Sequence, residues 1–179
     1  MFGEDEGSMK VLEAVRTVRA VRQFTERCVP PGVVMTIIEA GRLAASSINL
    51  QPWHFVVIED RERLRELGAI MRTGPYTADA SFAVVVLVEK ASPYAVSDAS
   101  RAIQNMILTA WAAGVGSNWV GFGPMPRVEQ LLGAPDMLEG LAVVPFGYRS
   151  GRPGPGKKKR KPLGEIASRE RFGVPFASP

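Results

Sequence analysis

Apolar residues recur along this chain in two patterns, one with the spacing of a helix face and one in short continuous runs. The helical spacing predicts helices over residues 9–18, 31–45, 61–71, 97–113 and 126–132. The continuous runs predict strands over residues 54–59, 82–88 and 141–148, and residues 118–122 form a strand or a loop. Ser8 suits the N-cap of the first helix, and Pro31 suits the first turn of the second.

Helices and strands alternate along the chain, which predicts an α/β or α+β fold with helices covering a sheet. The run from Phe82 to Val88 is apolar throughout, as expected of a strand that is covered on both faces. Pro145 lacks an N–H and therefore indicates that the last strand lies at an edge or ends there. At 179 residues the chain has the length of a single domain.

The two ends of the chain differ from its body. We expect residues 1–8 to be disordered, and the glycines and prolines within residues 149–156 exclude regular structure there. The tail after residue 161 contains the apolar residues Leu163, Ile166, Phe172, Val174 and Phe176. Such a tail is too apolar for a purely solvated end. We therefore predict that residues 149–179 form an extended arm that docks on a surface, with a second subunit as the candidate.

Composition narrows the class of protein. Apolar residues make up 46% and charged residues 22% of the chain, which is typical of a globular protein. No apolar run approaches the roughly 20 residues that cross a bilayer. The acidic first seven residues do not resemble a signal peptide. We expect a cytoplasmic protein that has no membrane partner.

The chain contains one cysteine, Cys28, and one histidine, His54. A single cysteine excludes an internal disulfide and a thiolate metal cluster. A single histidine excludes zinc sites of the HExxH kind and disfavours a Ser-His-Asp triad. We expect Cys28 to be a small packing residue and His54 to be a strand residue without a catalytic duty. Chemistry on this chain therefore needs a cofactor, and we predict no metal site.

The net charge of +4 is distributed unevenly, because residues 157–161 alone carry five positive charges. The rest of the chain is close to neutral, so the excess is a local cluster and not a basic face. We predict no nucleic-acid partner. A non-enzymatic binding module that uses the basic tail remains an alternative.

Residues 45–55 suit neither a core nor a spacer. They follow a predicted helix, precede a predicted strand, and contain two serines, a proline, an indole and the two carboxamides of Asn49 and Gln51. Each carboxamide offers both a donor and an acceptor. We interpret this stretch as a loop that recognises the edge of a flat heterocycle.

Three further groups complete a set with this loop: the pair Arg19 and Arg22, the glycine-flanked Trp119, and the basic run near the C-terminus. Flavin mononucleotide (FMN) carries a phosphate dianion, which arginine binds bidentately and lysine binds as a point charge. Its ring has an amide-like edge that carboxamides can mirror. The set therefore predicts an FMN site. An alternative for the two arginines is that they close the first helix and interact with its dipole.

The same motifs resemble the nitroreductase family of FMN-dependent oxidoreductases. The segments are Arg19-x-x-Arg22-x-Phe24, Ser46-x-x-Asn49-x-Gln51-Pro52-Trp53-x-Phe55, Gly116-x-x-Trp119-x-Gly121, Phe146-Gly147-Tyr148 and Arg160-Lys161-Pro162-Leu163. They occur in order over residues 11–172, and the Asn-x-Gln-Pro-Trp-x-Phe element is the most specific of them.

The resemblance implies an α+β domain with a central, mostly antiparallel sheet flanked by helices. It also implies a homodimer with an exchanged C-terminal arm and with two FMN sites between the subunits. The residues expected at the cofactor are Arg19, Ala20, Arg22, Ser46, Ser47, Asn49, Gln51, Val120, Gly121, Arg160 and Lys161. By this analogy residues 19–22 and 160–161 surround the phosphate and ribityl end. The loop of the partner subunit reaches the ring, and residues 120–121 offer backbone near flavin N5.

The chain departs from the family pattern near both halves of this site. The family often has Arg-Arg-Ser where this chain has Val18-Arg19-Ala20, which removes one charge and one hydroxyl from the phosphate pocket. Ala45 replaces a usual proline, and Ile48 replaces a common glycine. Ile48 would narrow the pocket or change which flavin face is open. Since no long insertion follows residue 88, we expect an open or small substrate site.

The resemblance implies an FMN-dependent oxidoreductase with a ping-pong mechanism. NAD(P)H would reduce the flavin at N5 and leave, and a small-molecule acceptor such as a nitroaromatic or a quinone would take its place. The flavin supplies the redox chemistry, so no catalytic side chain is predicted. Alternatives keep the fold with a divergent role, which is flavin-fragmenting, dehalogenating or deazaflavin-binding.

Overall fold

The computed structural model describes residues 9–121, 124–151 and 158–176. The predictions for residues 1–8, including disorder and the Ser8 N-cap, lie outside the described residues. Those for residues 122–123, 152–157 and 177–179 lie outside them as well.

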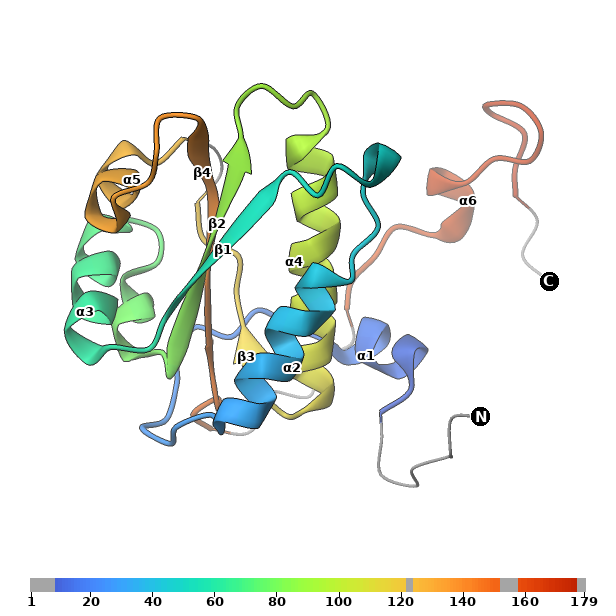
Figure 1. Cartoon of the computed structure of the whole chain (residues 1–179). Coiled ribbons are helices and arrows are strands. Elements are labelled where there is room, and N and C mark those ends of the chain that lie inside the picture. Colours follow the sequence, from blue (N-terminus) through green and yellow to red (C-terminus); the bar gives the residue numbers. More distant parts are fainter. Residues whose placement is uncertain (1–8, 122–123, 152–157, 177–179) are drawn as a thin grey trace.

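A four-stranded antiparallel sheet forms the centre of the molecule (Figure 1). Its strands are β1 (Trp53–Ile58), β2 (Phe82–Glu89), β3 (Gly116–Ser117) and β4 (Leu138–Gly147), in the order β1-β2-β4-β3. β2 pairs with β1 on one side and with β4 on the other, and its register with β4 shifts between Val86 and Leu87. Of the alternatives left open by the order of elements, the α+β class is the one that the structure adopts.

Helices cover both faces of the sheet (Figure 1). The helices α2 (Pro31–Arg42) and α4 (Ala95–Ala112) lie on one face, and α3 (Arg61–Ile70) and α5 (Pro126–Leu132) lie on the other. Along β2, Val84 and Val86 pack toward α2 and α4, whereas Val85 packs toward α3 and α5. All three are fully buried, so the prediction that this strand is covered on both faces is confirmed.

The first helix is shorter than predicted. α1 covers Val11–Thr17, and its N-cap is Lys10, whose side chain makes no capping bond. The next residues are extended: Ala20 pairs with Ser117 in parallel, and Phe24 pairs with Arg149 in antiparallel. Arg19 and Arg22 therefore belong to a segment that extends the sheet, and the alternative that they close the helix is wrong.

Pro145 and Cys28 also differ from expectation. Pro145 lies inside β4, which is not an edge strand. It falls between the pairing of Phe146 with Ser117 and that of Val143 with Val120, at a gap in the ladder that suits a residue without an N–H. Cys28 is exposed and not packed in the core.

The C-terminal segment extends away from the body of the molecule (Figure 1). It contains the short helix α6 (Leu163–Ile166), and apolar side chains are exposed along it, with Phe172 at 103% and Ile166 at 66% of their full area. Two single-turn helices, η1 (Ser47–Asn49) and η2 (Pro75–Asp79), complete the secondary structure of the described residues. Within these residues, no helix has both the length and the apolar character that crossing a bilayer requires.

Gly116 tests how the segment 19–24 is held against the sheet. A Cβ atom at Gly116 would lie 2.5 Å from Cγ2 and 2.8 Å from Cβ of the stiff Val21 side chain. We predict that Gly116→Ala lowers the free energy of unfolding by about 1–3 kcal/mol through overpacking. Gly32→Ala is the matched control, since a Cβ there meets nothing within 4 Å. Equal urea midpoints for the two variants would contradict this account of the packing.

Candidate functional site

Residues of the extended segment line a cavity of about 370 Å³. The residues that line it are Arg19, Ala20, Val21, Arg22, Gln23, Trp111, Arg149 and Ser150. The segment can approach the sheet closely because Gly116 and Gly147 have no side chains: added Cβ atoms would meet Val21 and Phe24. Val21 is buried, whereas Arg22 is exposed, as alternation along an extended chain requires.

Three of these lining residues are arginines, and none of the described residues lining the cavity is acidic. Trp111 forms part of the wall, and its Nε1 donates to Thr17 Oγ1 at 2.9 Å. The guanidinium carbon of Arg149 lies 5.9 Å from the centre of the Trp111 ring. Such a cavity suits an anion attached to a less polar group. Arg149 was absent from the sequence prediction, although its position directly after the last strand was a usable signal.

The basic run returns to the same end of the molecule. Lys158 Nζ donates to the carbonyl oxygen of Val15 in α1 at 2.7 Å. Partial burial lowers the pKa of Lys158, and the nearby positive charges of Arg160 and Arg19 lower it further. Arg160 and Arg19 therefore act on the same ammonium group. A bound anion would relieve this repulsion, so the structure brings the predicted Arg160 toward Arg19 and adds Lys158, which the sequence did not single out. Lys161 is exposed.

The loop that contains the predicted ring contacts has an unusual backbone. Ile48, Asn49 and Gln51 have φ of 45°, 59° and 53°, in the left-handed region. A β-branched residue such as Ile48 is strained there, whereas glycine is not. This explains physically why a glycine suits the position. The Ile48 side chain is 85% exposed and projects from the loop.

Several polar groups of the loop bond to one another or to α4. Ser46 Oγ accepts from the Gln51 N–H at 3.0 Å, and Gln51 Nε2 donates to the Asn49 carbonyl at 3.2 Å. Ser47 donates to Asp98 through its backbone N–H and through its hydroxyl. Among the described residues, the Asn49 side chain has no hydrogen-bond partner and is exposed. Asn49 is therefore the carboxamide of this loop whose donor and acceptor are both available to a ligand, since Gln51 uses its Nε2 within the loop.

Val120 and Gly121 differ in what they can offer. The N–H and the carbonyl of Val120 both bond to Val143, and the Val120 side chain is buried. The Trp119 indole donates to the Gly121 carbonyl at 2.7 Å, and Gly121 has a φ of 82°. Within this pair, backbone contact with a ligand would fall to Gly121.

One chain does not bring the two halves of the predicted site together. Ser47 is bonded to Asp98 near the start of α4, whereas Trp111 lies at the end of α4 in the wall of the arginine cavity. A helix rises 1.5 Å per residue, so these two ends of α4 are about 20 Å apart. Figure 1 places η1 and α1 at opposite ends of this helix.

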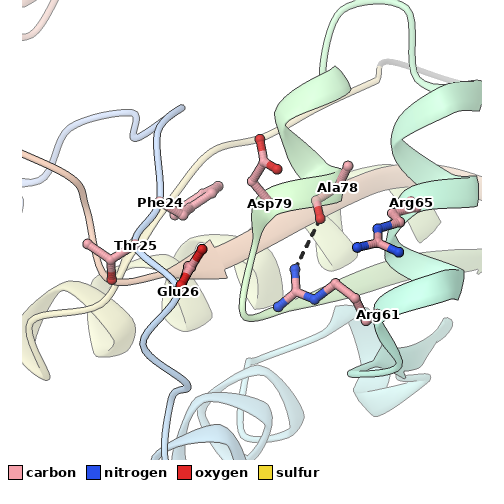
Figure 2. A pocket seen from close by; sticks show the side chains of 7 residues that line it. All are labelled: Phe24, Thr25, Glu26, Arg61, Arg65, Ala78 and Asp79. Atoms are coloured by element: carbon pink, nitrogen blue, oxygen red, sulfur yellow. Dashed lines mark hydrogen bonds between the residues drawn. The ribbon is translucent and has the colours of Figure 1, made fainter.

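A second cavity of about 470 Å³ lies beside the segment 24–26, between it, α3 and η2 (Figure 2). Its charged residues are Glu26, Arg61, Arg65 and Asp79. Arg61 is held by the Ala78 and Ala80 carbonyls at 3.1 and 3.0 Å. The mixed charges make this cavity less suited to a dianion than the arginine cavity. In the described residues, no three His, Cys, Asp or Glu side chains gather as metal ligands.

Lys158 gives the arginine cavity a testable pH dependence. Its pKa lies below the ordinary value of 10.5, and a bound phosphate dianion would raise that pKa by favouring the charged form. At pH values between the pKa of Lys158 in the free protein and its raised pKa in the complex, phosphate binding is then accompanied by uptake of a proton. We predict that affinity for inorganic phosphate falls as pH rises toward the ordinary lysine pKa of 10.5. Calorimetry should give a flatter profile for Lys158→Met, and identical profiles for the two proteins would contradict the placement of Lys158 at the anion.

Comparison with known proteins shows which family this chain is similar to. The model of the nitroreductase family matches residues 15–89 and 76–148. A Methanothermobacter thermautotrophicus protein with the provisional name NADH dehydrogenase/NAD(P)H nitroreductase is 34% identical over 154 residues, which cover 82% of this chain and 81% of that protein. The FMN reductase (NADPH) of Bacillus subtilis is 24% identical, covering 91% of this chain and 74% of that protein.

A solved structure agrees with these sequence relatives. The crystal structure of a Bacteroides thetaiotaomicron protein, which has the same provisional name as the archaeal relative, superposes with a TM-score of 0.82 at 26% identity. The match covers 90% of this chain and 98% of that chain. The chain therefore belongs to the nitroreductase family.

Proposed function

We propose that this protein is an FMN-dependent oxidoreductase that uses NAD(P)H to reduce a small organic acceptor, such as a nitroaromatic or a quinone, by a ping-pong mechanism. The observation that carries the proposal is the arginine cavity, which combines three guanidinium groups with an aromatic wall and, among its described residues, lacks an acidic one. The relatives named NAD(P)H nitroreductase and FMN reductase (NADPH) support the reaction class and both cofactors.

The residues of the cavity fit the phosphate end of FMN. Arg22 and Arg149 can each present two N–H groups to phosphate oxygens, and Arg19 adds positive charge from the same segment. Arg160 and Lys161 would close on the phosphate from the C-terminal segment, with Lys158 tying that segment to α1. Ala20 lines the cavity without a polar group, so it provides space and not a bond.

The loop of η1 fits the ring end. The exposed Asn49 carboxamide offers a donor and an acceptor to the amide-like edge of the flavin, while Ser46, Ser47 and Gln51 fix the loop that presents it. Gly121, with Val120 anchoring it in the sheet, would place backbone beside N5. When bound, FMN supplies hydride transfer at N5, and the protein supplies binding, orientation and shielding from water.

The proposed assembly is a homodimer with composite sites. The two halves of the site lie at opposite ends of α4, so one chain would bind the phosphate while the loop of the other reaches the ring. Apolar side chains are exposed on α1 and α2, including Val11 at 77% and Met35 at 69%. Together with the apolar arm, these surfaces offer area for a second copy to bury.

The visible spectrum tests this function directly. Protein that is purified, or reconstituted with FMN, should be yellow, and its flavin absorbance should bleach when NADH or NADPH is added anaerobically. Colour should return when a quinone is then added, as a ping-pong mechanism requires. A colourless protein that does not bind added FMN would contradict the proposal.

Arg22→Ala tests the same claim at one residue. Removing a charged hydrogen-bonding partner of the phosphate should weaken FMN binding by about 1.5–3 kcal/mol. Arg127→Ala is the control, because Arg127 is an exposed arginine of α5, on the other face of the sheet. Flavin titration followed by fluorescence quenching measures both variants. If Arg22→Ala bound FMN as tightly as Arg127→Ala does, the phosphate would have to lie elsewhere.

A further inference from the structure

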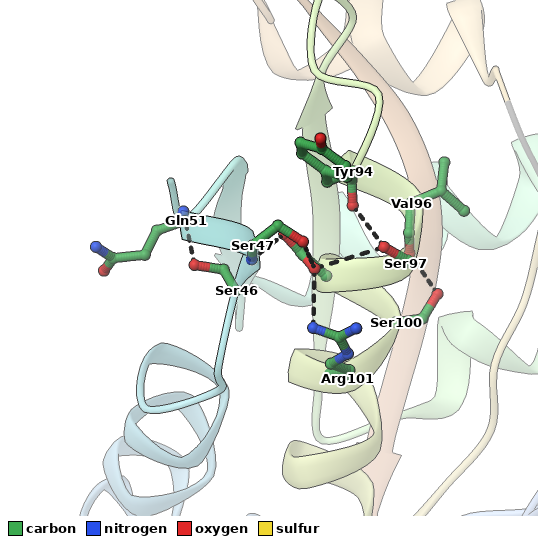
Figure 3. Close-up of polar contacts among 9 residues, drawn as sticks. Ser46, Ser47, Gln51, Tyr94, Val96, Ser97, Ser100 and Arg101 are labelled. Carbon is green, nitrogen blue, oxygen red and sulfur yellow. Dashed lines mark hydrogen bonds and ion pairs between the residues drawn. The ribbon is translucent and has the colours of Figure 1, made fainter. Parts of the chain in front are cut away.

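Asp98 is a carboxylate with no exposed surface, in the first turn of α4. One oxygen, Oδ2, accepts the backbone N–H of Ser47 at 2.8 Å. The other, Oδ1, accepts the Ser47 hydroxyl at 3.2 Å, Arg101 Nη1 at 3.0 Å and the Ser97 hydroxyl at 3.4 Å. Figure 3 shows Ser47 of the loop facing Arg101 and Ser97 of the helix, with dashed lines meeting between them.

The favourable position of Asp98 at the start of a helix does not explain why its carboxylate is buried. Taking a charged group out of water costs several kcal/mol unless its oxygens are fully bonded. The start of a helix favours a negative charge, but that benefit is available at the surface too. Arg101 remains 55% exposed, so the ion pair alone does not require a buried partner. What burial adds is the pair of bonds to Ser47, which lies 51 residues away in sequence.

The two bonds to Asp98 hold Ser47, the residue that directly precedes the strained part of the loop. Ser47 directly precedes Ile48 and Asn49, which have positive φ, and Gln51 has one as well. A non-glycine residue in this conformation is strained and persists only when surrounding contacts enforce it. The bond from the Gln51 N–H to Ser46 Oγ closes the loop on itself but does not attach it to the body of the protein.

We infer that Asp98 is a positioning residue for the ring-binding loop, one that holds residues 46–51 so that Asn49 faces the flavin. This inference rests on the proposed function. Asp98 has no exposed surface and does not itself contact the flavin. It acts through Ser47, and its position on α4 sets the loop relative to the sheet. The phosphate end of the same site, which the other chain of the proposed dimer would supply, is independent of Asp98.

Two variants with a matched control test the inference. Asp98→Asn keeps the side-chain volume but places a donor where Ser47 or Arg101 also donates. Ser47→Ala removes the hydroxyl bond and leaves the backbone bond. Ser100→Ala is the control, since the Ser100 hydroxyl donates to the Val96 carbonyl within α4. For each protein, the dissociation constants of FMN and of inorganic phosphate are measured, together with the absorption spectrum of bound flavin.

The expected results distinguish a change in binding of the flavin ring from a change in binding of the phosphate. Asp98→Asn should raise the dissociation constant of FMN about ten- to hundredfold and shift the flavin spectrum, because a bond to a charged group is lost. Ser47→Ala should raise it about threefold to tenfold. Affinity for inorganic phosphate should stay at the wild-type value in both variants, and Ser100→Ala should match wild type throughout.

Three results would overturn the inference. One is wild-type FMN affinity and an unchanged flavin spectrum in Asp98→Asn. Another is an equal loss of FMN and phosphate affinity, since that would mark a general loss of structure. If Asp98→Asn does not fold, the same comparison in Ser47→Ala decides. The third is a wild-type protein that binds no FMN, which would overturn the proposed function and this inference with it. If the wild-type protein binds FMN but the variants do not show the expected changes, only the inference is overturned and the proposed function stands.

Discussion

The packing of α4 against the doubly buried strand β2 is the constraint on which the candidate site depends. Val84 and Val86 of β2 and Ile103 and Met106 of α4 are fully buried in the same cluster. Gly41 of α2 lets that helix approach closely, since a Cβ there would lie 2.9 Å from the Met106 side chain. Close packing of this kind holds α4 in a fixed position against the sheet and α2. Its first turn then holds the loop of residues 46–51, and its last turn places Trp111 in the wall of the arginine cavity.

The two parts of the proposed site differ in physical character: one is defined by its positive charge and the other by the conformation of a loop. At one end of α4, cations from the segment 19–24, from residue 149 and from the basic run gather without a neutralising acid among the described lining residues. At the other end, a buried carboxylate holds a strained loop on which the Asn49 carboxamide is exposed and has no hydrogen-bond partner among the described residues. An FMN molecule that spans both needs the loop of a second chain, because roughly 20 Å of helix separates the two ends within one chain.

Residue type alone was enough to propose part of the candidate site. Arg19 and Arg22 were proposed because guanidinium groups suit a phosphate, and Asn49 because a carboxamide suits a flavin edge. The structure places both arginines in one cavity and leaves Asn49 exposed, and their contacts with FMN stay a prediction. Family membership and the α+β fold, predicted from these motifs, are confirmed by the comparisons. Strand 82–88 was equally readable, since burial on both faces leaves an unbroken apolar run.

Features that depend on tertiary contacts could not be read in this way. Arg149 lines the cavity, and Lys158 lies near Arg19, only because distant parts of the chain return to the N-terminal region. Asp98 has no local feature that distinguishes it from other acids in the first turn of a helix, and its bonds to Ser47 join residues 51 positions apart. Pro145 suggested an edge strand, because no local signal reveals a gap in the pairing of a neighbouring strand.

The central claim is that each flavin site combines the arginine cavity of one chain with the loop of another. It can be tested by coexpressing Arg22→Ala and Asn49→Ala chains with different affinity tags and isolating the dimers that carry both tags. Each variant alone should bind FMN weakly. The mixed dimer should regain tight binding at one of its two sites, roughly half the wild-type stoichiometry. If both halves of a site came from the same chain, the mixed dimer would regain no tight binding, and the account would be contradicted.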